Sequence, residues 1–134
     1  MGDMPGDLKY SKSHEWLRAN DDGTVTIGIT DHAQEQLGDL VYVEVPEHGR
    51  ELELEEACAV VESVKAASDV YMPVTCEVLE VNATLEDSPE LVNEDPFGEA
   101  WFVRVSLSDP SELEDMLDAA AYQAFAEKEI AAGH

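Results

Sequence analysis

Basic residues are scarce in this sequence. Of its 134 residues, 31 are Asp or Glu and only 7 are Lys or Arg, which gives a formal net charge of -24 at pH 7. A surface with this charge repels phosphate backbones and anionic lipid headgroups. We therefore expect neither nucleic-acid binding nor membrane binding.

Long hydrophobic runs are also missing. The apolar stretches are only a few residues long, far shorter than a helix that spans a bilayer. Residues 1–8 have neither the basic start nor the apolar segment of a signal peptide, and we expect them to form a flexible tail. Hydrophobic residues still make up 44% of the chain, enough for a core. We expect one soluble domain over residues 1–134, located in the cytoplasm.

The sequence contains two cysteines and no clustered histidines. Cys58 and Cys76 lie outside any CxxC motif, and in a cytosolic protein we expect them to be buried free thiols. The four histidines show no spacing typical of metal ligands, so the sequence predicts no metal site.

The strong acidity has two interpretations, which the sequence does not separate. Like charges repel one another at low ionic strength and are screened by salt, so the acidity could be an adaptation to a salty interior. Alternatively, the acidic residues could form a docking surface for partner proteins.

The pattern of apolar residues predicts a mainly β fold. Alternating and β-branched residues predict a short strand within 8–16 and further strands over 24–29, 40–45, 57–64, 69–74, 77–81 and 101–105. A short helix is predicted near 31–37, with Asp31 as its N-cap and Gly38 at its end. Many short strands separated by turns favour a β-sandwich or a barrel.

A longer helix is predicted near 110–128, at the C-terminal end of the chain. Pro110 follows Asp109, which is typical of a first helical turn. Apolar residues then recur at helical spacing from Leu113 to Phe125. We expect this amphipathic helix to pack on the sheet.

One of the four lysines is predicted at the tip of a hairpin. Lys65 lies between two predicted strands, where a rigid scaffold would hold it out for a modifying enzyme. A lysine that forms a Schiff base must be neutral, whereas the nearby Glu62 and Asp69 favour the protonated form. The residues therefore favour a tether over a catalyst, although position alone also fits a plain solvated side chain.

Residues 60–74, around this lysine, read VVESVKAASDVYMPV. This segment resembles the lipoylation segment of the glycine cleavage system H protein, and the resemblance continues over 77–82. It also includes 14–16, 26–33, 89–93 and 96–98, and covers roughly residues 8–130. Several matches in the same order are more specific than a single motif.

This resemblance implies a lipoyl/biotinyl-type barrel-sandwich hybrid in which Lys65 carries lipoic acid in amide linkage. The attachment-hairpin motif would comprise Glu62, Ser63, Val64 and Ala66. By matching, Ser13, Glu15 and Asp69 are candidates to line a cleft that receives the loaded arm. A carboxylate there could pair with the protonated amine of the arm.

The resemblance further implies a covalent carrier of glycine catabolism and one-carbon metabolism rather than an enzyme. The arm would take the aminomethyl group of glycine from the glycine decarboxylase P protein and deliver it to the aminomethyltransferase T protein. The dihydrolipoamide dehydrogenase L protein would reoxidise the dithiol, and lipoate-attaching enzymes would modify Lys65. Alternatives are a lipoate relay or non-glycine lipoyl carrier and an H-like binding module that is never lipoylated. The sequence shows no nucleophile–base pair or phosphate loop of an independent enzyme.

Related carriers and local departures refine this interpretation. Biotin carriers place methionine on both sides of the lysine, whereas here the neighbours are Val64 and Ala66. Cys76 replaces a glycine that is usual in the family, and it would be strained if that position requires a positive φ. Met72 replaces a residue that is usually small and polar.

Overall fold

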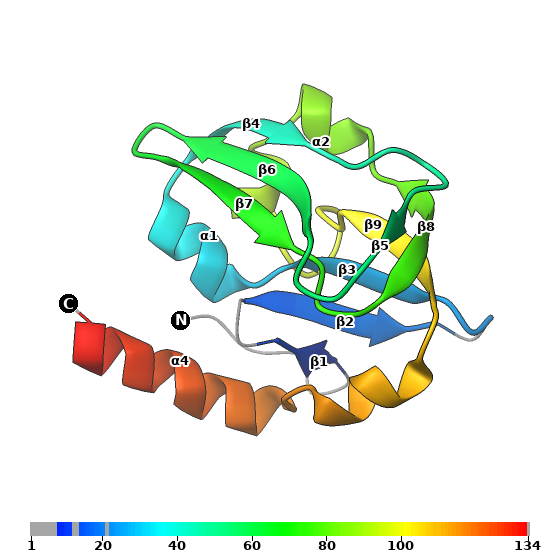
Figure 1. The fold of residues 1–134 in the computed structure, drawn as a ribbon. Helices are drawn as coiled ribbons and strands as arrows, with labels where there is room; N and C mark the ends of the chain where they lie inside the picture. Colours follow the sequence, from blue (N-terminus) through cyan, green and yellow to red (C-terminus); the bar gives the residue numbers. More distant parts are fainter. Residues whose placement is uncertain (1–7, 12–13, 21, 134) are drawn as a thin grey trace.

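Two antiparallel sheets make up most of the fold (Figure 1). The computed structural model describes residues 8–11, 14–20 and 22–133, so residues 1–7 of the expected tail and the candidate Ser13 lie outside the described residues. One sheet has six strands in the order β1-β2-β3-β9-β8-β5, and the other has three in the order β4-β6-β7. This architecture confirms the expected mainly β barrel-sandwich fold.

The strands are short, as their turn-rich sequence predicts. The six-stranded sheet consists of β1 (Lys9–Tyr10), β2 (Glu15–Ala19), β3 (Val25–Ile29), β9 (Val103–Leu107), β8 (Cys76–Val81) and β5 (Glu51–Leu52). The three-stranded sheet consists of β4 (Leu40–Glu44), β6 (Ala57–Ser63) and β7 (Ala67–Tyr71).

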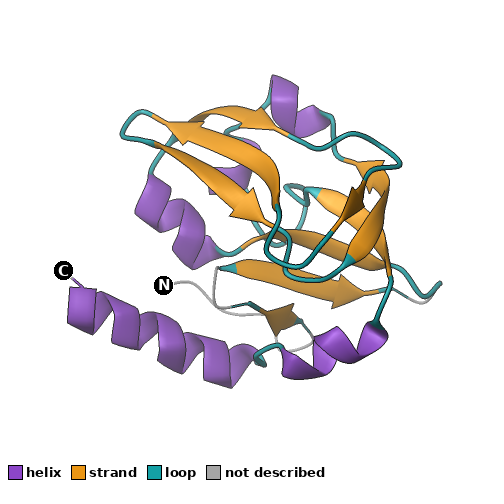
Figure 2. Cartoon of the chain, in the orientation of Figure 1, coloured by secondary structure: helices purple, strands orange, loops and turns teal. Residues whose placement is uncertain are grey.

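Helical segments lie at the edges of the sheets (Figure 2). They are α1 (Asp31–Leu37), α2 (Thr84–Asp87), α3 (Leu91–Glu94), the 3₁₀ helix η1 (Pro110–Asp115) and α4 (Ala119–Gly133). Helices α2 and α3 could not be predicted from the sequence, because four residues are too few to show a helical period.

The main core lies between the two sheets. Alternate residues of both sheets point into it, including Ile27 of β3, Val61 of β6 and Val78 of β8, each at most 2% exposed. Ala33 and Leu37, four residues apart on one face of α1, pack against this core. The core thus holds α1 beside the three-stranded sheet.

A second apolar cluster joins α4 to the outer face of the six-stranded sheet. Its buried members are Leu8, Tyr10, Trp16, Tyr122 and Ala126, so residue 8 of the expected tail is in fact part of a core. Figure 1 shows α4 running beside β1. Trp16 faces Gly28 across the β2–β3 pair, and a Cβ on Gly28 would lie 2.6 Å from Cζ2 of Trp16. Glycine is needed there because the indole occupies the space of a side chain.

The C-terminal helix differs from the prediction in its extent. The predicted helix near 110–128 is divided into η1 and α4. Between them, Leu117 forms an antiparallel bridge with Tyr10, whose backbone N–H donates to Leu117 O at 2.7 Å. This long-range pairing replaces the helical hydrogen bonds at that point, and the prediction of one continuous helix was wrong there.

The N-cap of α1 lies one residue before the predicted one. Thr30 Oγ1 accepts the hydrogen bond of Ala33 N at 3.2 Å, whereas Asp31 accepts from the Gln34 side chain at 2.7 Å. At the other end, Gly38 ends the helix as predicted, with a φ of 83° and its N–H donating to Gln34 O.

The two cysteines are free and buried, as expected. Cys76 begins β8, and the non-glycine residues with a positive φ in the described part of the chain are His14 and Glu55. Cysteine is therefore unstrained in place of the usual glycine. Burial raises the pKa of Cys58 and that of Cys76 to about 12. Met72 is also fully buried and adds to the core.

Candidate functional site

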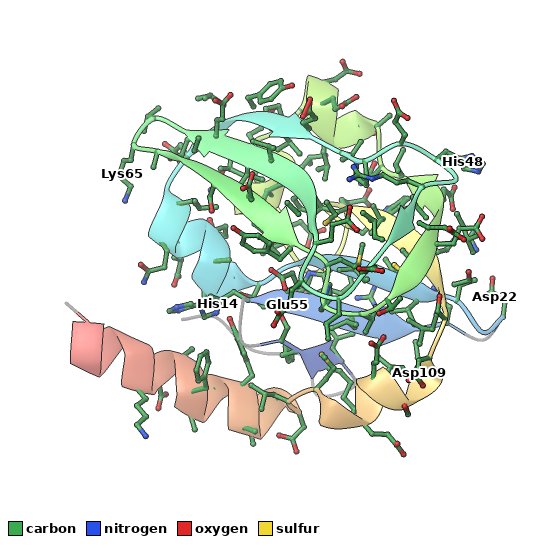
Figure 3. All side chains as sticks on the ribbon, in the orientation of Figure 1. His14, Asp22, His48, Glu55, Lys65 and Asp109 are labelled. Carbon is green, nitrogen blue, oxygen red and sulfur yellow. The ribbon has the colours of Figure 1, made fainter. Side chains whose placement is uncertain are left out.

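Lys65 lies at the tip of the β6–β7 hairpin and is exposed to solvent (Figure 3). The strand ladder pairs Glu62 with Ala67 directly below the tip. The turn is therefore shorter than the gap of residues 65–68 between the predicted strands over 57–64 and 69–74, since β6 ends at Ser63 and β7 already begins at Ala67. A short turn on a paired hairpin holds the lysine clear of the sheet.

Ser63 fixes the conformation of this tip. Its hydroxyl oxygen accepts hydrogen bonds from the backbone N–H groups of Lys65 and Ala66, each at 3.1 Å. The backbone N–H of Ser63 donates to Ala66 O at 2.8 Å. A serine that bonds to nearby backbone groups favours a turn. Ser63 of the predicted motif thus has a structural role, because it fixes the position of Lys65 in the turn.

The C-terminal end of α1 lies beneath the lysine. A Cβ on Gly38 would stand 3.1 Å from Cε of Lys65, so the stem of the lysine passes closely over the glycine. The backbone N–H of Val64 also donates to Asp39 O at 3.3 Å. The hairpin tip is therefore supported from one side by the α1–β4 connection.

Asn93 of α3 holds this connection in place. Its Nδ2 donates to Gly38 O at 2.8 Å and to Gln34 Oε1 at 2.9 Å, and its Oδ1 accepts from Leu40 N at 2.9 Å. The sequence alone indicates no role for Asn93, which lies within the matched stretch 89–93. Its contacts join segments more than 50 residues apart, and neither periodicity nor spacing reveals such contacts.

A cleft of about 160 Å³ lies below the hairpin, between β7, α1 and the start of β2. Apolar side chains of both sheets and α1 line it together with a few polar ones. The lining residues are His14, Glu15, Ile29, Ala33, Gln36, Leu37, Val61, Ser68, Asp69 and Val70. It can therefore accept a mainly apolar chain that has a polar end.

Two of the three cleft candidates meet in this cleft. Glu15 is only 2% exposed, and one of its carboxylate oxygens accepts a hydrogen bond from Ser11 Oγ at 2.7 Å. Asp69 is exposed and pairs with Val60 on the hairpin. The structure thus brings Glu15 and Asp69, which are 54 positions apart in the sequence, to one cleft.

The other residues of the attachment-hairpin motif surround the lysine. Glu62 and Ala66 are exposed, and Val64 is 74% exposed beside Lys65. An apolar side chain with this exposure has no packing role in the fold. Its place at the tip makes it available to whatever approaches the lysine.

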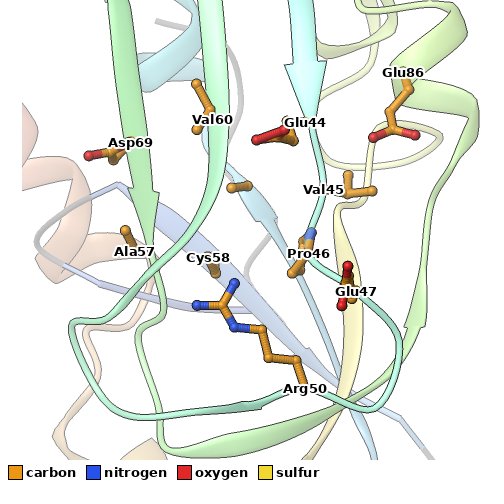
Figure 4. Close-up of a pocket in the computed structure, with 11 residues that line it drawn as sticks. Glu44, Val45, Pro46, Glu47, Arg50, Ala57, Cys58, Val60, Asp69 and Glu86 are labelled. Atoms are coloured by element: carbon orange, nitrogen blue, oxygen red, sulfur yellow. The ribbon is translucent and has the colours of Figure 1, made fainter.

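A larger hollow of about 580 Å³ has a different character (Figure 4). The carboxylates of Glu44, Glu47, Asp69 and Glu86 line it around a single guanidinium, that of Arg50. Arg50 already forms an ion pair with Glu56 at 3.1 Å. Lys65 is not among its lining residues, and its acidic rim is unsuited to an apolar arm.

The described residues contain no group of three or more His, Cys, Asp or Glu side chains placed to hold a metal ion. Among the same residues, no helix combines the length and the hydropathy needed to cross a membrane.

Comparisons with known proteins agree with the geometry. The family model described as "Glycine cleavage H-protein" matches residues 8–129. The chain is 61% identical over 123 residues to the glycine cleavage system H protein of Alkalilimnicola ehrlichii, covering 92% of this chain and 95% of that protein. It is 59% identical to the one from Halorhodospira halophila, with the same coverage. Among solved structures, a glycine cleavage system H protein from Mycobacterium marinum has a TM-score of 0.78 and 36% identity, covering 90% of this chain and 97% of that one.

Proposed function

Since the chain belongs to the glycine cleavage H-protein family, we propose that it is the lipoyl carrier of that system, with lipoate in amide linkage to Lys65. The observation that carries this proposal is the position of Lys65, exposed on a hairpin tip that Ser63 and the α1–β4 connection fix from two sides. A modifying enzyme requires a lysine that is both accessible and held in a defined place.

The residues around Lys65 fit a lipoyl group. The lysine stem extends past Gly38, and no side chain of that residue obstructs it. Acylation removes the positive charge of the lysine, so the modified tip is less polar. When bound, lipoate supplies a disulfide that accepts the aminomethyl group of glycine.

The cleft below the hairpin is suited to receive the loaded arm. Ile29, Leu37 and Val61 offer apolar surface to a hydrocarbon chain. Glu15 and Asp69 offer carboxylates that can pair with a protonated amine at its end. We propose that they bind the amine, together with Ser13, and that the cleft thereby limits the access of water to it.

The proposed partners follow from the family. The chain would receive the aminomethyl group from the P protein and pass it to the T protein, and the L protein would reoxidise the dithiol. Lipoate-attaching enzymes would acylate Lys65 beforehand. The chain itself would act as a carrier in the cytoplasm and not as a catalyst.

Glycine–bicarbonate exchange with P protein tests the pathway. Lipoylated wild-type protein should support exchange of labelled bicarbonate into glycine, and Lys65→Arg should not. Lys128→Arg is a matched control, because Lys128 is also exposed but lies on α4. A lipoylated protein that is inert with P protein would contradict the glycine pathway and favour a lipoate relay or another lipoyl carrier.

A further inference from the structure

The hydroxyl of Tyr122 lies between two walls of the cleft. Tyr122 is on α4 and is fully buried. Its Oη is 2.7 Å from His14 Nδ1 and 2.7 Å from Thr30 Oγ1. His14 lines the cleft directly, and Thr30 caps α1, which forms another wall. One side chain of the C-terminal helix thus contacts residues at both walls of the cleft.

His14 is held in an unusual backbone conformation. Its φ of 74° is uncommon for any residue other than glycine and costs energy. Its backbone N–H donates to Ser11 O at 3.1 Å, and its carbonyl accepts from Thr30 N at 3.0 Å. Its ring contacts the rings of His32 on α1 and Phe125 on α4, with centroids 4.7 Å and 5.9 Å away. Strained residues of this kind concentrate at functional sites.

The contacts of Thr30 indicate which hydroxyl donates in its hydrogen bond with Tyr122. Thr30 Oγ1 already accepts from Ala33 N at 3.2 Å. Within the described part of the chain, the acceptor left for the Thr30 hydroxyl hydrogen is Tyr122 Oη. A buried hydroxyl that fails to donate loses free energy, so Thr30 donates to Tyr122. The Tyr122 hydrogen can then go to His14 Nδ1, which must be unprotonated to accept it.

We propose that Tyr122 is a positioning residue for the cleft. It donates to Nδ1 of His14, holds that imidazole in the Nε2–H form, and ties α1 and the start of β2 to α4. The positions of these side chains do not depend on the proposed function. The role of the fixed cleft does rest on the proposed function, because a cleft of fixed width would retain the loaded arm. Through Tyr122, α4 would therefore help to fix the shape of the cleft.

The tautomer of His14 tests the geometry without any lipoyl group. In a two-bond proton–nitrogen spectrum at about pH 8.5, where an ordinary imidazole is neutral, His14 of the wild type should show the Nε2–H pattern. Tyr122→Phe removes only the hydroxyl, so its His14 should show a larger Nδ1–H population. Tyr71→Phe is the control, since Tyr71 is 43% exposed on β7. An Nδ1–H form in the wild type, or the same tautomer ratio in Tyr122→Phe, would overturn the proposal.

Retention of the arm tests the consequence. Lipoylated protein loaded with methylamine from glycine should lose the amine about two to ten times faster in Tyr122→Phe than in Tyr71→Phe, as the net contribution of one hydrogen bond implies. Equal loss rates with the expected tautomer change would refute the role in retention.

Two controls keep both tests interpretable. Thr30→Ser keeps the hydroxyl that donates to Tyr122, so it should behave as the wild type in both measurements. If Tyr122→Phe fails to fold, Thr30→Val removes the donor to Tyr122 instead. Tyr122 should still donate to His14 Nδ1 there, so His14 should keep the Nε2–H form, and a shift towards the Nδ1–H form would contradict the proposed direction. Failure of lipoylation itself would leave the spectroscopic result intact and would count only against the proposed function.

Discussion

The stem of Lys65 lies against Gly38, with room for no side chain between them. A Cβ on Gly38 would lie 3.1 Å from Cε and 3.7 Å from Nζ of the lysine. Gly38 also has φ 83° and ψ -162°, a combination essentially confined to glycine. Helix termination and presentation of the lysine therefore depend on the same residue.

Replacing Gly38 should affect both stability and modification. We expect Gly38→Ala to lower the free energy of unfolding by about 1–3 kcal/mol, because alanine is strained in this conformation. Its Cβ should also displace the lysine stem and slow lipoylation of Lys65. Urea unfolding and the rate of lipoyl transfer measure the two effects.

Gly49→Ala separates strain from position. Gly49 has a similar φ of 87°, but a Cβ there would meet nothing within 4 Å. We expect the Gly49→Ala variant to be less stable than the wild type but to be lipoylated at the rate of the wild type. Equal lipoylation rates in Gly38→Ala and Gly49→Ala would contradict a role of Gly38 in presenting Lys65.

Asn93 should be needed to hold the α1–β4 connection that supports the hairpin tip. Asn93→Asp keeps the acceptor for Leu40 N but removes both donors, to Gly38 O and Gln34 Oε1. We expect a loss of about 1–3 kcal/mol in the free energy of unfolding, since two part-buried acceptors lose their partner. Glu94→Gln, at the exposed neighbouring position, is the control in urea unfolding and should change little. A stability of Asn93→Asp equal to that of the control would show that the three contacts are dispensable.

The local elements of this fold were predictable, and their long-range contacts were not. The alternation in residues 24–29 correctly predicted β3, and the helix predicted near 31–37 is α1, which ends at Gly38 as expected. The cap fell on Thr30 and not Asp31 because both residue types cap well and stand side by side. The break before α4 depends on the pairing of Tyr10 with Leu117, far apart in the sequence, so helical periodicity could not show it.

The candidate site divides in the same way. The exposed position of Lys65 on a hairpin tip could be predicted because it lies between two well-patterned strands. Glu15 and Asp69 came from resemblance alone, and only the fold shows that they line one cleft. The contacts of Asn93 and Tyr122 beside the cleft and the hairpin could not be predicted, because their hydrogen bonds span 53 to 108 positions of sequence.

The two cysteines should be unreactive in the folded protein. Only the thiolate is nucleophilic, and burial raises the pKa of both thiols to about 12. Labelling with iodoacetamide near pH 8 should be at least on the order of a thousand times slower than for a free thiol. It should become complete in urea, and rapid labelling of the native protein would contradict the burial.

The raised pKa of the two thiols should also make the free energy of unfolding fall at alkaline pH. The folded thiols keep their protons between pH 9 and about 12, where the unfolded ones ionise. The stabilisation is therefore complete below pH 9 and falls as the pH rises towards 12. Cys58→Ala/Cys76→Ala should show a smaller decline in unfolding free energy over this range than the wild type.

Salt should stabilise the fold if the acidity is an adaptation to it. The net charge of -24 produces repulsion that added ions screen. We expect the melting temperature to rise as KCl is added from low ionic strength, and NaCl at equal ionic strength should act similarly. A melting temperature indifferent to both salts would contradict this interpretation and favour an acidic docking surface.

Intact mass of the protein from its native cells is the most direct test that Lys65 is a lipoyl tether. Wild type and Lys128→Arg should both carry the added mass of one lipoyl group, and peptide mapping should place it on Lys65. Lys65→Arg expressed in the same cells should lack it while keeping the melting temperature of the wild type. An unmodified wild-type protein, or a lipoyl mass retained in folded Lys65→Arg, would contradict the account.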